Sequence, residues 1–198
     1  MINIIFKPGW KAVKAIYPKK NWTSKIWRPM MLTLVMFCSA LYAKSDSLEL
    51  IDTISSWIVN GYPSILGFIL SGYVLLIGFV GSDFLLALER RQRDDGVSLF
   101  QVVNSTFVVV ISVVLFTYML GALFGFVHKC HIEWPFDNQL YVYYNYGALV
   151  AILFSFSYSL FALYDVLINI FNMGQFATVL TRKRLKSMRN DKRCDTNE

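Results

Sequence analysis

The chain has 198 residues, of which 56% are hydrophobic, 16% aromatic and 16% charged, and its formal net charge is +6. Soluble chains carry about 25% charged residues, so this composition excludes an ordinary soluble domain. We expect an all-α integral membrane protein with its basic residues placed on one side of the bilayer.

The first segment, residues 1–28, is basic and contains no acidic residue. Within residues 6–17, apolar side chains share one helical face and lysines share the opposite face. The apolar face has Phe6, Trp10, Val13 and Tyr17, and the basic face has Lys7, Lys11 and Lys14. This pattern predicts an amphipathic helix in the inner headgroup layer, bound to anionic lipids or, alternatively, to a partner protein.

Four apolar runs predict a transmembrane domain over residues 29–171, with spans at about 29–43, 63–88, 100–127 and 146–171. The last three runs are long enough to cross a hydrocarbon core of about 30 Å. The first run is short and also suits the hydrophobic region of a signal peptide. We interpret it as a span, because the basic segment before it is longer than a signal peptide requires.

A second amphipathic helix is predicted on the outer surface at residues 46–60. Asp46 and Glu49 form a plausible N-cap arrangement, and Asn60-Gly61 followed by Pro63 is expected to end the helix. Its apolar stripe has Leu50, Ile51, Ile54, Trp57 and Ile58.

The other outer loop, residues 128–146, is rich in aromatic residues and predicts either an interfacial belt or a binding surface. It also contains His128, Cys130, His131 and Glu133. Their spacing does not match a zinc site, so we expect no metal and no other cofactor.

The distribution of lysine and arginine predicts that both termini are cytoplasmic. Basic residues concentrate in residues 1–28, 87–99 and 172–198, whereas the opposite side has only Lys44 and Lys129. Such residues are retained on the cytoplasmic side, so these three segments are expected there.

Small residues recur along the second and third spans at helical spacing. They are Gly67, Ser71, Gly78 and Ser82 in the second span, and Gly121 and Gly125 in the third. Helices associate in lipid through close backbone approach over such residues. The pattern predicts either helix packing within one chain or a seam between subunits of a homo-oligomer.

Two ionisable side chains, Asp83 and Asp165, lie within predicted spans near the cytoplasmic side. Because such groups are costly in hydrocarbon, they usually pair or face water. One interpretation pairs them with Arg90, Arg93 or backbone donors. The other places them around a polar inner cavity or a cation path.

No catalytic motif is recognisable, because the sequence has no P-loop, no HExxH, no GxSxG and no dinucleotide fingerprint. We therefore expect no enzyme activity. The tail, residues 172–198, has a cationic run with four alternative roles: membrane topology, contact with anionic lipid, contact with a cytoplasmic protein, or nonspecific binding of nucleic acid. The residues of this run that we expect to contact a partner or lipid are Arg182, Lys183, Arg184, Lys186 and Arg189.

The layout of four spans, inner termini, a second span of the form GFILSGYVLLIGF and a basic tail resembles small membrane subunits of bacterial anti-phage operons. The membrane subunit of the Kiwa defence system is similar in this layout. The resemblance implies an inner-membrane homo-oligomer, with a tetramer favoured, that senses phage infection and works with a cytoplasmic DNA-binding partner. Two alternatives keep the topology: an immunity protein against a pore-forming bacteriocin, and a channel or death effector that permeabilises the membrane.

Overall fold

The computed structural model describes residues 10–17, 22–79, 86, 88–90, 96–130 and 138–195. These residues form helices and no strand. The helices are α1 (Trp10–Ile16), α2 (Trp22–Tyr42), α3 (Ser47–Phe79), α5 (Leu99–Lys129) and α6 (Asn138–Asp195). The predicted all-α class is therefore confirmed for the described part of the chain.

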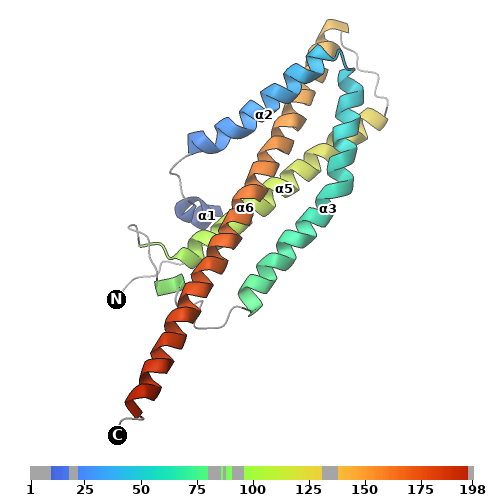
Figure 1. Ribbon diagram of the computed structural model, residues 1–198. Coiled ribbons are helices and arrows are strands. Elements are labelled where there is room, and N and C mark those ends of the chain that lie inside the picture. The colour runs from blue at the N-terminus through green and yellow to red at the C-terminus, as the bar shows by residue number, and fades with distance from the viewer. Residues whose placement is uncertain are drawn as a thin grey trace.

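The three longest helices, α3, α5 and α6, pack against one another, while α2 lies along α6 and α1 lies against α5 (Figure 1). Cross-helix contacts show that α2 runs antiparallel to α6 and α3 runs antiparallel to α5, whereas α3 and α6 run in the same direction. On α2 and α6, Lys25 lies near Asp165 and Phe37 lies against Tyr146. The antiparallel order is what short connections between successive helices produce.

The core lies between α3, α5 and α6 and contains fully buried apolar side chains such as Ile58, Phe107 and Ile152. The outer surface is also apolar, since Phe68 is 75% exposed and Phe126 is 66% exposed. A helix that is hydrophobic on all sides is typical of a membrane span. Two helical segments of the described chain, Leu99–Lys129 and Tyr141–Val179, are long and apolar enough to cross a membrane.

The finer topology, with four spans and cytoplasmic termini, stays a prediction. Part of the predicted second span lies outside the described residues, since α3 is described to Phe79. The first predicted span lies within α2, which begins at Trp22, before the run of apolar residues.

Helix α3 corrects the predicted end of the 46–60 helix. The predicted cap is confirmed, because the Leu48 backbone N–H donates to the Asp46 Oδ1 at 3.0 Å. The helix then continues through Gly61 and Pro63 as one element of 33 residues. Proline removes only one backbone donor, and packing on neighbouring helices is sufficient to hold the remaining turns together.

The apolar stripe of that segment is used for packing within the chain. Ile51, Ile54 and Ile58 are buried, and Ile58 lies against α5 at Gly121. Trp57, which was predicted on the same stripe, is 61% exposed. Residues 47–60 are therefore the first part of a long packed helix and not a separate surface helix.

Helix α6 joins the predicted fourth span and the predicted tail without a break. It has 58 residues, which at about 1.5 Å per residue gives a rod of about 87 Å. In Figure 1 its C-terminal part extends well beyond the other helices. The predicted boundary between residues 171 and 172 is thus not a break in the backbone.

The predicted amphipathic helix at residues 6–17 is described only from Trp10, and its Phe6 and Lys7 lie outside the described residues. Its helical part is α1, which packs against α5. The contact brings the N-terminal segment to the helix bundle, close to the polar residues that line the gap between α2, α5 and α6.

Candidate functional site

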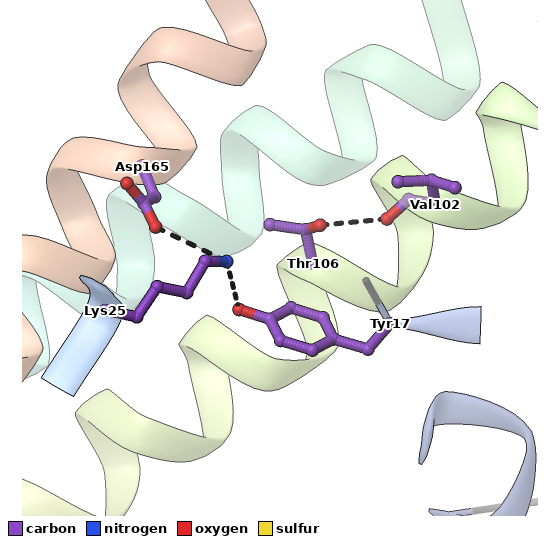
Figure 2. Close-up of polar contacts among 5 residues, drawn as sticks. All are labelled: Tyr17, Lys25, Val102, Thr106 and Asp165. Carbon is purple, nitrogen blue, oxygen red and sulfur yellow. Dashed lines mark hydrogen bonds and ion pairs between the residues drawn. The ribbon is translucent and has the colours of Figure 1, made fainter. Parts of the chain in front are cut away.

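The side chains of Tyr17, Lys25 and Asp165 meet at the Lys25 ammonium group, and we call these three residues the Lys25 cluster (Figure 2). The Lys25 Nζ donates to the Tyr17 hydroxyl at 2.7 Å and lies 3.7 Å from the Asp165 Oδ2. It also lies 4.6 Å from the centroid of the Tyr17 ring. The cluster therefore ties the end of α1 and the start of α2 to the middle of α6.

The helices bring these groups together through their antiparallel packing. Lys25 is in the first turn of α2, and Asp165 is on the stretch of α6 that passes that end of α2. On α5, Thr106 directs its hydroxyl to the Val102 carbonyl at 2.9 Å (Figure 2), so this hydroxyl does not bind the cluster. The ion pair is thus built by α2 and α6 alone.

The ion pair is only partly shielded, since the Lys25 side chain is 31% exposed and the Asp165 side chain is 42% exposed. At this exposure in water, such a pair contributes at most about 1 kcal/mol to stability. Its larger effect is to give Asp165 a counter-charge within an apolar helix, where an unpaired carboxylate is costly.

A cleft of about 210 Å³ opens beside the cluster and is called the polar cleft here. Its polar lining comes from Tyr17, Lys25, Arg28, Tyr158 and Asp165. Its apolar lining comes from α5 and α6, with Val109, Val110, Val113, Phe161 and Ala162. Two cations and one carboxylate give the cleft a net positive charge, which suits an anionic group.

Of the two predicted intramembrane acids, Asp165 is in this cleft and Asp83 lies outside the described residues. Among the described residues the basic partner of Asp165 is Lys25, whereas the sequence suggested Arg90, Arg93 or backbone donors. Arg93 lies outside the described residues. Lys25 and Tyr17 were not identified as site residues. The one signal in the sequence was that Lys25 comes just before the first predicted span, on the same predicted side of the membrane as Asp165.

The small residues divide into two groups. A Cβ on Gly121 would lie 2.7 Å from the Ile58 Cγ2, and one on Gly125 would lie 3.5 Å from the Ser55 Cβ, so these glycines pack α5 onto α3. A Cβ on Gly67 or Gly78 would meet no atom within 4 Å. A subunit contact through these two open glycines of α3 stays a prediction.

The other predicted residues are the serines of the second span and the candidate metal ligands of the outer loop. Ser71 is exposed on α3, and Ser82 lies outside the described residues. His128 and Cys130 belong to the described part, which has no group of three metal-binding side chains. His131 and Glu133 lie outside it.

The predicted contact residues of the tail lie on the last part of α6. Arg182 is exposed. For Lys183, Arg184, Lys186 and Arg189 the structure describes the helical backbone, and their side chains lie outside the described part. The tail is therefore a helical extension of a candidate membrane span.

Comparisons of the chain with protein-family models, with curated proteins and with solved structures find no match. The described residues show helices only, two segments long and apolar enough to cross a membrane, and a cleft with a net positive charge at the Lys25 cluster. The charge of the cleft is complementary to an anion.

Proposed function

We propose that this chain is a non-enzymatic inner-membrane subunit of a bacterial anti-phage defence system. It acts as a homo-oligomer, senses infection at the envelope and recruits a cytoplasmic DNA-binding protein through its tail. The proposal rests on the layout of the sequence, which resembles the membrane subunits of such systems, together with one structural observation.

That observation is the continuity of α6 from Asn138 to Asp195. Its candidate membrane segment is Tyr141–Val179. Residues 180–195 extend the helix by about 24 Å more, at about 1.5 Å per residue. An uninterrupted helix behaves as a rod, so a shift or rotation at its membrane part reaches the cationic run at its end.

The cationic run, RKRLKSMR, supports a protein contact. Leu185 and Met188 are three residues apart and share one face of a helix, which gives the basic surface an apolar patch. The basic residues of the N-terminal segment and of the 87–99 loop already satisfy the positive-inside rule. Orientation therefore does not require the charge of the tail.

Truncation after Thr181 tests recruitment. In bacteria that carry the chain with its flanking genes, the truncated protein should still insert and assemble but should lose its cytoplasmic partner in pull-downs and its protection in plaque assays. The contact should also weaken as salt rises, because exposed charges are screened over about 8 to 10 Å at physiological ionic strength. Retained protection together with retained pull-down would contradict the proposal.

A second variant tests the rod. Insertion of Gly-Pro-Gly after Thr181 keeps every tail residue but breaks the helix. We expect recruitment to persist and protection to fall. The matched control is the same insertion after Lys44, in the turn between α2 and α3 where the backbone already has a positive φ.

Protection against a pore-forming bacteriocin instead of phage would favour an immunity protein, and loss of membrane potential on infection would favour a pore.

A further inference from the structure

An apolar groove continues from the polar cleft along the surface between α5 and α6. It has a volume of about 400 Å³ and is lined by side chains that include Trp10, Phe116 and Phe154. The groove and the polar cleft share Val109, Val113 and Tyr158 in their linings. The two spaces therefore adjoin, and we treat them as one site with a charged end and an apolar end.

The depth of this site follows from α5. Residues 101–106 of α5 include several polar side chains, whereas residues 107–127 are almost entirely apolar. At about 1.5 Å per residue the apolar run is roughly 30 Å long, which matches the hydrocarbon core of a bilayer. Val109, in the lining of both spaces, thus lies close to one boundary of the hydrocarbon, and Phe116 lies nearer its centre.

The orientation matches that of a phospholipid. The charged end is at the level where headgroups lie, and the apolar end runs from there into the level of the acyl chains. The basic N-terminal segment beside this end places it in the inner leaflet by the positive-inside rule. A free anion would use the cleft but would gain nothing from the groove.

The charges also select an anion. Lys25 is compensated by Asp165, while Arg28 is exposed one turn further along α2 and has no ion-pair partner among the described residues. An unpaired guanidinium near hydrocarbon is costly, and it binds phosphate oxygens through two parallel hydrogen bonds. The hydroxyls of Tyr17 and Tyr158 line the same cleft and are suitable donors.

We propose that the polar cleft and the groove bind one anionic glycerophospholipid of the inner leaflet. Arg28 and Lys25 hold its phosphate, and one acyl chain lies between α5 and α6. The site does not depend on the defence function, because a lipid bound here would also be expected in an immunity protein or a pore.

Native mass spectrometry of the full chain tests the proposal after reconstitution in mixed phosphatidylglycerol and phosphatidylcholine. We expect the wild type to retain phosphatidylglycerol selectively. Arg28→Gln should reduce this retention about tenfold, which corresponds to about 1.4 kcal/mol. Arg28→Lys should restore part of it, since lysine keeps the charge and loses the paired hydrogen bonds. Lys44→Gln, which removes an exposed cation in the turn between α2 and α3, is the control and should have no effect.

The groove is tested separately. Ser112→Phe fills the apolar end and leaves the charges in place, so it should remove the bound lipid while Arg28 is unchanged. Phosphatidylglycerol with brominated acyl chains should quench the fluorescence of the wild type more than that of Trp10→Phe, because Trp10 lines the groove. This measurement uses the lipid as the probe and does not depend on the stability of an Arg28 variant.

Four results would overturn the proposal. Equal retention of the two lipids, or equal retention by Arg28→Gln and Lys44→Gln, would exclude a selective lipid site. Displacement of the lipid by millimolar inorganic phosphate would indicate a site for a free anion. Disulfide cross-linking of Ser112→Cys between two chains, with no bound lipid, would mean that a second copy covers the groove.

Discussion

The contact between Gly121 on α5 and Ile58 on α3 gives the sharpest prediction. Gly121→Ala adds a Cβ that would lie 2.7 Å from the Ile58 Cγ2 and 3.0 Å from the Ile58 Cβ. Ile58 is fully buried on α3, and its branched side chain has one strongly preferred rotamer in a helix. The neighbouring side chain therefore cannot turn away, and α3 must shift from α5.

The magnitude follows from two opposing terms. Overpacking a well-packed core costs about 1–3 kcal/mol. Replacing glycine by alanine inside a helix stabilises by about 1 kcal/mol. We expect Gly121→Ala to destabilise the protein by about 0–2 kcal/mol, the difference between these two terms. Gly67→Ala is the matched control, because its Cβ meets no atom within 4 Å and only the gain in helix propensity remains.

A double-mutant cycle identifies the contact responsible. Ile58→Ala leaves a cavity and should itself cost about 2–5 kcal/mol. In the Gly121→Ala background it removes the clashing Cγ2, so the same substitution should cost about 1–2 kcal/mol less. Equilibrium unfolding in mixed detergent micelles measures all four proteins. The reasoning is refuted if Gly121→Ala is as stable as Gly67→Ala, or if the two substitutions in the cycle are additive.

Three further predictions concern association, charge and a buried hydroxyl. Gly67→Leu combined with Gly78→Leu should weaken the homo-oligomer without unfolding the chain, since a Cβ at either position meets no atom within 4 Å. Light scattering in detergent measures the mass of the oligomer, and a wild type that is monomeric at every concentration contradicts the prediction. Asp165→Asn removes the ion pair with Lys25 and should change plaque protection while altering stability by at most about 1 kcal/mol; if Asp165→Leu equals the wild type in expression and protection, the pair has no role. Ser157→Ala should be neutral or stabilise the protein by up to about 1 kcal/mol in the same unfolding assay, because the Ser157 Oγ is buried with no hydrogen-bond partner among the described residues. A loss of stability of more than about 1 kcal/mol would indicate that this hydroxyl has a partner.

The sequence was sufficient to predict the helices but not where they end. Hydrophobic runs and the Asp46 cap identify α3, because both depend on local chemistry. The continuation through Gly61 and Pro63 depends on packing, since Ile58 before that point and Ile69 after it are both buried. Local breaker signals are weak when tertiary contacts hold both halves of a helix.

The candidate site was predictable in part for a similar reason. A lone aspartate in an apolar run is conspicuous, so Asp165 was identified from the free-energy cost of placing a charged side chain in hydrocarbon. Its partner Lys25 is far away in sequence and is one of many lysines in a basic segment. Only the antiparallel alignment of α2 with α6 distinguishes it from the others, and that alignment is set by contacts such as Phe37 with Tyr146.

Helix α6 links the two proposals through one physical element. It supplies Tyr158 and Asp165 to the polar cleft, and it continues without a break to the basic tail. If a lipid binds more tightly in one position of α6 than in another, thermodynamic linkage requires that a tail partner which favours that position also strengthens lipid binding by the same factor. The coupling needs no new contact between the two sites, because the helix that moves is shared. A lipid affinity that is unchanged when the tail partner binds would therefore show that α6 is held in one position, and recruitment would then be constitutive.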